Sequence, residues 1–129
     1  MILQIIYSII LGMFIGMERE QCGKVVGYRT VSLITLGSTL FTLMSPEIFG
    51  GDNSRVIAQI VSGMGFLGAG VIFKNGDNIT GLTTAATLWA AAAIGCLVGV
   101  GMNDAALIGT AFILFINHFH LFKQNLHEH

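Results

Sequence analysis

The sequence predicts an all-α fold, a polytopic membrane bundle of about five transmembrane helices. Of the 129 residues, 53% are hydrophobic and only 10% are charged, whereas about 25% of the residues of a soluble domain are usually charged. The mean hydropathy is +0.77. So few charges cannot cover a water-facing surface of this size. We therefore expect the lipid bilayer to surround one transmembrane domain, residues 1–122, which a short cytoplasmic tail, 123–129, follows.

The charged residues leave five long uncharged runs between them. No Asp, Glu, Lys or Arg occurs in residues 1–17, 30–46, 56–73, 78–103 or 105–122. As a helix, a run of 17 residues spans roughly 25 Å, the short end of what crosses a hydrocarbon core of about 30 Å. Each run is therefore interpreted as one transmembrane helix. The first run could instead be a signal peptide, although it lacks the basic start typical of one.

The positive charges predict how these helices are oriented. With five crossings, the connections around 18–29 and 74–82 and the C-terminal tail share one side of the membrane. That side carries five of the six Lys and Arg residues, Arg19, Lys24, Arg29, Lys74 and Lys123, and the other side carries Arg55. Because short cytoplasmic loops are enriched in Lys and Arg, we expect the N-terminus outside and the C-terminus in the cytoplasm.

Small residues at four-residue intervals mark the first and fourth predicted helices. They are Ser8, Gly12 and Gly16 in the first helix and Thr87, Ala91, Gly95 and Gly99 in the fourth. Residues four apart share one face of a helix. In lipid, such faces let another helix approach closely, and close packing drives helix association there. We therefore predict that both rows are helix-packing faces.

The third run contains "SGMGFLGAG", whose spacing Gly63-x-Gly65-x-x-Gly68 also occurs in nucleotide-binding loops. That function needs a preceding strand, a following helix and an acidic residue about 20 positions later, and this context lacks them. Gly63, Gly65, Gly68 and Gly70 are therefore assigned to helix packing, with this helix at the centre of the bundle. A second interpretation stays open, in which these glycines allow local unwinding and expose carbonyl groups to a ligand or ion.

Turn-forming and capping residues predict where two of the helices end. Pro46 is expected to stop the second helix, because proline cannot continue the hydrogen-bond ladder without loss. Asn75 and Gly76 are typical of a turn. Thr83 or Thr84 is expected to cap the fourth helix, whose N-terminus is also a possible anion site.

Polar residues at the helix ends make up the predicted functional cluster. Its members are Glu18, Arg19, Glu20, Arg29, Thr30, Arg55, Gln59, Thr83 and Thr84. Gln59 is expected to point inward, because an amide in lipid needs a hydrogen-bond partner. Glu18 or Glu20 is expected to pair with Arg29 in a folding or functional network, although such charges also commonly extend to the lipid headgroups.

These stretches together resemble the membrane domain of the MgtC/SapB family. The matching residues are Gly16-x-Glu18-Arg19-Glu20, Gly27-Tyr28-Arg29-Thr30, Arg55-x-x-x-Gln59, "QIVSGMGFLGAGVIF" and "GLTTAATLWAAAAIG". The likeness covers nearly the whole chain. It implies a multi-pass protein of the bacterial inner membrane, without an established enzymatic activity, that takes part in growth at low magnesium, virulence and acid tolerance. One branch, which has an added C-terminal soluble domain, is linked to ATP synthase. The resemblance therefore makes ATP synthase a possible partner.

Three functions are weighed from these residues. The first is a non-catalytic membrane regulator that binds itself, as a homo-oligomer, or another membrane protein. The alternative is a channel or transporter for Mg²⁺ or another cation, lined by Thr35, Gln59 and the glycines of the third helix. An enzyme is the weakest hypothesis, because no nucleophile–base pair has a working spacing. We expect no cofactor, no metal site at Cys22, Cys96 or the histidines near the C-terminus, and no nucleic-acid partner.

Overall fold

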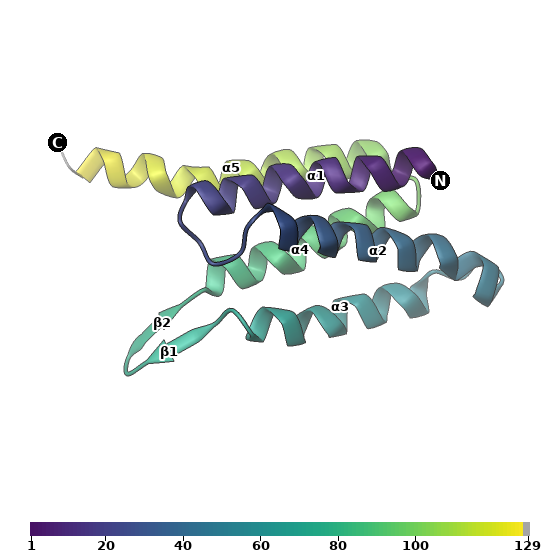
Figure 1. Cartoon of the computed structure of the whole chain (residues 1–129), viewed down its shortest axis with the longest axis horizontal. Coiled ribbons are helices and arrows are strands. Elements are labelled where there is room, and N and C mark those ends of the chain that lie inside the picture. Colours follow the sequence, from purple (N-terminus) through teal and green to yellow (C-terminus); the bar gives the residue numbers. More distant parts are fainter. Residues whose placement is uncertain (128–129) are drawn as a thin grey trace.

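The computed structural model describes the backbone of residues 1–127 and the side chains of residues 1–119. Its elements are α1 (Ile2–Gln21), α2 (Tyr28–Phe49), α3 (Ser54–Ala69), β1 (Phe73–Asn75), β2 (Asn78–Thr80), α4 (Leu82–Gly99) and α5 (Asn103–His127). Each uncharged run thus overlaps one helix, and the all-α prediction is confirmed except for one short β-hairpin (Figure 1). Residues 128 and 129 of the predicted tail, including His129, lie outside the described residues.

The helices differ in how well they suit a bilayer. Three of them, α1, α2 and α4, have the length and apolar composition needed to cross a membrane. With 16 residues, α3 is shorter, about 24 Å long against a hydrocarbon core of about 30 Å. Five crossings therefore remain a prediction. The start of α1 and the end of α5 lie at opposite ends of the bundle, and the α1–α2 connection and the hairpin lie at the same end as the end of α5 (Figure 1).

The centre of the bundle is α4, and the prediction that the third helix occupies it is wrong. All four other helices contact α4, whereas α3 packs on α4 and only slightly on α2. Figure 1 shows α3 along one side of the bundle, with α1 and α5 on the other. Small and aliphatic residues occupy several faces of α4, among them Ala91, Ala92, Gly95 and Val98, all buried. Small side chains on several faces let α4 be approached from all sides, whereas the glycines of α3 are mostly unmatched by neighbours.

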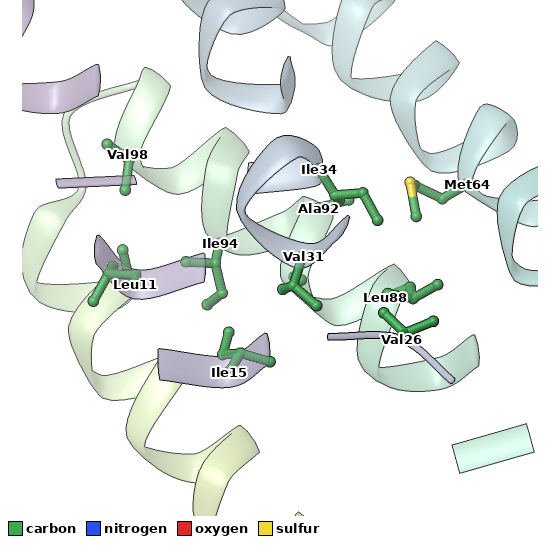
Figure 2. Close-up of a cluster of buried hydrophobic side chains, with 12 residues drawn as sticks. Leu11, Ile15, Val26, Val31, Ile34, Met64, Leu88, Ala92, Ile94 and Val98 are labelled. Carbon is green, nitrogen blue, oxygen red and sulfur yellow. The ribbon is translucent and has the colours of Figure 1, made fainter. Parts of the chain in front are cut away.

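A core of aliphatic side chains joins α1, α2 and α4. Leu11 and Ile15 of α1 lie near Ile94 of α4, and Leu88 of α4 lies near Ile34 of α2 (Figure 2). In the same cluster, α3 contributes only Met64 to the fully buried side chains. Because lipid is as apolar as these residues, close packing rather than exclusion of water holds such helices together. The core thus explains the firm attachment of α1, α2 and α4 and the looser one of α3.

Glycine and hydroxyl side chains bring α2 very close to both α1 and α4. A Cβ atom at Gly16 of α1 would lie 2.8 Å from the Gly27 carbonyl oxygen, and one at Gly95 of α4 would overlap the Thr35 carbonyl oxygen. The Thr35 hydroxyl donates to the Ser8 carbonyl oxygen of α1 over 2.8 Å. These glycines belong to the small-residue rows of the first and fourth helices, so both rows face α2.

The same pattern continues along the rest of both rows. A Cβ atom at Gly12 would overlap the Thr35 side chain, and one at Gly99 would lie 2.5 Å from the Thr42 Cβ atom. The Thr39 hydroxyl donates to the Gly95 carbonyl oxygen over 2.8 Å. Ala91 is fully buried. No larger residue than glycine fits at Gly12 or Gly99 unless the helices move apart.

Two helix ends differ from the sequence-based expectation. Pro46 lies inside α2, which continues to Phe49 and ends where Gly50 adopts a left-handed φ of 64° and donates to the Pro46 carbonyl oxygen. Proline in the last turn costs only one ladder bond, and the glycine supplies the stop. At the start of α4, Gly81 with φ 87° takes the cap position and no side chain bonds to the first turn. The capping prediction for Thr83 and Thr84 is therefore wrong.

The hairpin that precedes α4 was not expected from the sequence. Strands β1 and β2 pair antiparallel, with Asn75 opposite Asn78, around the predicted Gly76 turn, where φ is 63°. All six strand residues are exposed. Such a short, exposed pair lacks the buried alternation that predicts a strand, and it therefore gives no signal in the sequence beyond the turn itself.

Candidate functional site

An ion pair in the last turn of α1 forms the first part of the candidate site. The Arg19 Nε atom lies 2.6 Å from Glu18 Oε2, and its Nη2 atom lies 2.7 Å from Glu18 Oε1. The side chains are only 3% and 12% exposed. Two parallel bonds of this kind are the strongest geometry available to an arginine and a carboxylate. The expected pairing of Glu18 with Arg29 is therefore replaced by pairing with the next residue.

Polar side chains of α4 and α5 lie beside this ion pair. The Asn117 Nδ2 atom donates to the Thr87 hydroxyl over 3.3 Å, and that hydroxyl donates to the Thr83 carbonyl oxygen over 2.8 Å. Asn117 also lies close to the Glu18 carboxylate. We call Glu18, Arg19, Thr87 and Asn117 the polar cluster. It links α1, α4 and α5, because Asn117 of α5 interacts with both the Thr87 hydroxyl of α4 and the Glu18 carboxylate of α1.

The pKa of a cysteine at the edge of the polar cluster depends on the charge of that cluster. The Cys22 Sγ atom, just beyond α1, lies 3.2 Å from Glu18 Oε1. Burial raises the pKa of the Cys22 thiol above its ordinary value, and its hydrogen bond to Glu18 and the negative charge there raise this pKa further. Both causes disfavour the thiolate. Cys22 is therefore held as a neutral thiol that donates to the carboxylate.

The structure divides the predicted functional residues among three places. Glu18, Arg19 and Thr84 are buried or nearly so at the end of the bundle. Glu20, Arg29 and Thr83 are exposed at the same end, and the Tyr28 amide donates weakly to Glu20 over 3.4 Å. Thr30, Arg55 and Gln59 line a groove elsewhere. The predicted residues therefore do not form one cluster.

That groove runs between α2 and α3. Its volume is about 930 Å³, within the roughly 300–1,000 Å³ of common ligand pockets. Apolar side chains such as Leu33, Phe41 and Leu67 form most of its walls, and Leu88 of α4 also lines it. Arg55 is the one charged residue in its lining. We refer to it as the α2–α3 groove.

Gln59 and Thr35 do not share the pore-like lining that an ion pathway would need. Gln59 is exposed and lines the α2–α3 groove rather than a central passage. Thr35 is fully buried between α1 and α2, where its hydroxyl is bonded to a carbonyl oxygen. The expected lining residues thus lie apart, because Thr35 of α2 faces α1 and Gln59 of α3 faces the α2–α3 groove.

The four glycines assigned to packing in the third helix have fewer neighbours than expected. A Cβ atom at Gly63 or Gly65 would meet no atom within 4 Å. Gly68 would make ordinary contact with Ala85 of α4, 3.7 Å away, and Gly70 faces the Leu67 carbonyl oxygen of its own helix. α3 stays helical through Ala69, so the chain is not unwound there.

Sequence reasoning missed Thr87 and Asn117 as members of the polar cluster. Asn117 lies within the uncharged run 105–122 and is only 7% exposed. The rule that an amide in lipid needs a partner applies to it as much as to Gln59, and it was the available signal. Within the described residues, no group of three or more His, Cys, Asp or Glu side chains is arranged to hold a metal ion.

Comparison with known proteins matches the sequence of this chain to a family model. The family model described as "MgtC family" matches residues 5–128. The chain belongs to the MgtC family. Together with the three helices that suit a bilayer, this membership identifies a membrane protein. It also confirms the family that the motifs around Glu18, Arg29 and Arg55 indicated.

Several relatives of this MgtC-family chain carry the name "Protein MgtC". The protein of Brucella abortus (strain 2308) is 48% identical over 112 residues, which cover 85% of this chain and 47% of the relative. That of Salmonella typhimurium (strain LT2) is 46% identical over 116 residues, 90% of this chain and 50% of the relative. The chain thus spans about half the length of these relatives. No solved structure matches it.

Proposed function

We propose that this chain is a non-catalytic, multi-pass protein of the bacterial inner membrane that regulates another membrane protein, or a second copy of itself, by binding it. The proposal rests chiefly on a row of small residues along the outer face of α3. Ala58, Ser62, Gly65 and Ala69 are all exposed, and their spacings of four, three and four residues place them on one helical face. Small residues are what membrane helices use to approach each other.

A comparison with α1 supports the interpretation of this row as a binding face. In α1 the corresponding glycines lie against the backbone of α2, whereas Gly65 of α3 has no atom within 4 Å of a Cβ position. A glycine inside a helix costs roughly 1 kcal/mol relative to alanine. Among the described residues nothing offsets that cost at Gly65. A second helix packed on the outer face of α3 would offset this cost, as α2 does at the glycines of α1.

The hydroxyl groups inside the bundle favour binding over transport. The hydroxyls of Thr35, Thr39 and Thr42 each donate to a backbone carbonyl oxygen. A side chain that is bonded in this way stabilises helix contacts and is not free to replace the water around an ion. Magnesium flux into sealed liposomes above that of empty vesicles would contradict the regulator.

The setting follows from the family resemblance. We propose that the chain acts in growth at limiting magnesium, in acid stress or in virulence, and that ATP synthase is one candidate partner. The chain spans about half the length of its named relatives. The role of the other half of those proteins is therefore not proposed for this chain.

Photo-crosslinking from α3 tests the binding face. A photoreactive residue is placed at Ser62 or at Gly65, and the matched control carries it at Ala111, an exposed small residue of α5. We expect Ser62 and Gly65 to give one protein adduct of defined mass in native membranes and Ala111 to give none. Adducts with lipid alone from all three positions would overturn the proposal.

A growth assay separates binding from folding. Gly65→Leu should impair growth at limiting magnesium, because the larger side chain blocks close approach at the α3 face. Ala111→Leu should not impair it. Both positions are exposed, and equal amounts of the two variants in the membrane fraction would show that the difference is not one of folding.

A further inference from the structure

The α2–α3 groove has an amphiphilic lining that the regulator role does not use. It faces the side of α3 that carries Gly63 and Met64, not the outer row at Gly65. Arg55 and Gln59, four residues apart, lie at one end, and the walls beyond them are almost entirely apolar. From this arrangement we propose that the α2–α3 groove binds one anionic phospholipid, with its phosphate at Arg55 and its acyl chains along the groove.

The length of the groove fits a lipid that lies along α3. Its lining extends from Arg55 to Gly70 of α3, about 22 Å at 1.5 Å per residue. One leaflet of the hydrocarbon core is about 15 Å thick, half of the core. Acyl chains that enter beside Val56 can therefore run their full depth past Gly63 without leaving the groove.

The charge at the end of the groove favours an anion. Arg55 is exposed, and within the described side chains it takes part in no ion pair. The nearby Asp52 carboxylate accepts through Oδ1 from the Ser54 amide over 2.9 Å and from the Ser54 hydroxyl over 2.6 Å, and it attracts Arg55 without forming an ion pair with it. An arginine binds phosphate oxygens through two parallel bonds, and basic sites between membrane helices bind lipid headgroups in this way. The Gln59 amide can donate to the same headgroup.

The weak contact between α2 and α3 supports a small occupant that stays in place. These two helices follow each other in the chain, yet α3 is held mainly by α4. Gly37 of α2 and Gly63 of α3 line the groove with open space where a Cβ atom would be. Acyl chains that fill this space would give both helix faces the contacts that they lack within the chain. A membrane helix would fill it as well, but it does not require a cation at one end and apolar walls beyond.

Lipid retention by the purified protein tests the proposal. The full chain is reconstituted with equal amounts of phosphatidylglycerol and phosphatidylcholine, extracted in a neutral detergent, and its retained lipid is counted by native mass spectrometry. We expect the chain to retain about one phospholipid, with a preference of roughly tenfold for the anionic lipid, since the choline group of phosphatidylcholine brings a positive charge close to Arg55 and the glycerol group of phosphatidylglycerol does not. Equal retention of both lipids, or none of either, would overturn it.

Two kinds of variant locate the site. Arg55→Gln should abolish the preference for the anionic lipid, whereas Arg29→Gln, the same change at an exposed arginine outside the groove, should keep it. Gly37→Leu should lower retention of both lipids, because Gly37 lines the groove and a Cβ atom there meets nothing within 4 Å. Thermal unfolding shows that each variant is folded. If Arg55→Gln and Arg29→Gln behave alike, or if a cysteine at position 37 crosslinks efficiently to a second copy, the groove holds no such lipid.

Discussion

The interface of α2 with α1 and α4 and the interface of α2 with α3 use glycine in opposite ways. In the first, Gly16 and Gly95 lie against carbonyl groups of α2, and threonine hydroxyls bond across the contact. In the second, Gly37 and Gly63 face open space, and the two helices diverge around the α2–α3 groove. We call the first the tight interface.

The difference shows that a high glycine content does not by itself mean that a helix is closely packed. The row of α1 and the row of α4 each meet a partner row with hydroxyl and β-branched side chains, so each missing Cβ atom is replaced by a neighbour's atoms. α3 is the richest in glycine over its last turns, yet little of this chain fills the space there. Glycine thus marks where something can approach, and the partner's identity must come from elsewhere.

The largest expected effect comes from filling the tight interface. A Cβ atom at Gly95 would overlap the Thr35 carbonyl oxygen and lie 2.7 Å from the Ser38 Cβ atom, so Gly95→Val forces two backbones apart. Overpacking costs roughly 1–3 kcal/mol where side chains can yield, and we expect more than about 3 kcal/mol here. The free energy of unfolding, measured in mixed micelles, checks this.

Gly65→Val is the matched control for Gly95→Val. Its Cβ atom meets nothing within 4 Å, and its change in the free energy of unfolding should stay below about 1 kcal/mol. If the two variants lose equal stability, the contrast between the tight interface and α3 is not real.

The next largest effect compares a buried arginine, Arg19, with an exposed one, Arg55. Arg19→Ala leaves the Glu18 carboxylate, only 12% exposed, without its partner, and the loss of one partner of a buried pair costs about 3–5 kcal/mol. Since the pair lies at the end of the bundle, we expect the lower value, about 3 kcal/mol. The free energy of unfolding of Arg55→Ala should change by less than about 0.5 kcal/mol, because Arg55 is exposed. The same micelle titration measures both, and a larger loss for Arg55→Ala would reverse the assignment.

A smaller effect is expected from one hydroxyl of the tight interface. Thr39→Val keeps the shape of the side chain and removes its bond to the Gly95 carbonyl oxygen, 2.8 Å away. Such a bond is worth about 1 kcal/mol in water and similar or less between membrane helices. Thr30→Val, at an exposed position, should be neutral within about 0.5 kcal/mol. A neutral Thr39→Val would mean that close packing alone, without this bond, holds α2 to α4.

The sequence is sufficient to predict the helices but not how they are arranged. Charge-free runs identify all five helices, because charge is costly in lipid wherever the helix lies. The central place of α4 depends on whether each small residue meets another helix, and Gly95 and Gly65 look alike until the partner is known. The Pro46 stop was placed too early for a related reason, since Gly50 rather than proline ends α2.

Only part of the candidate site was predicted, because its geometry also depends on how the helices pack. Glu18 and Arg19 are recognisable as charges at the end of an apolar run, but their mutual pairing depends on side-chain geometry that spacing does not encode. Asn117, 98 residues after Arg19 in the chain, joins them only because α5 packs beside α1. The α2–α3 groove has no sequence signature at all, because it is a space between helices.

The smallest expected effect concerns the end of α1, outside the tight interface. Burial and the Glu18 carboxylate raise the pKa of the Cys22 thiol, so at pH 8 less of it is thiolate, the form that maleimide alkylates. Glu18→Gln removes the negative charge and leaves that of Arg19, which lowers this pKa. In a Cys96→Ser background we therefore expect Glu18→Gln to speed alkylation a few-fold at pH 8. Glu20→Gln, an equal change of charge at an exposed residue, should leave the rate unchanged. Equal rates in both variants would mean that the Glu18 carboxylate does not accept a hydrogen bond from the Cys22 thiol.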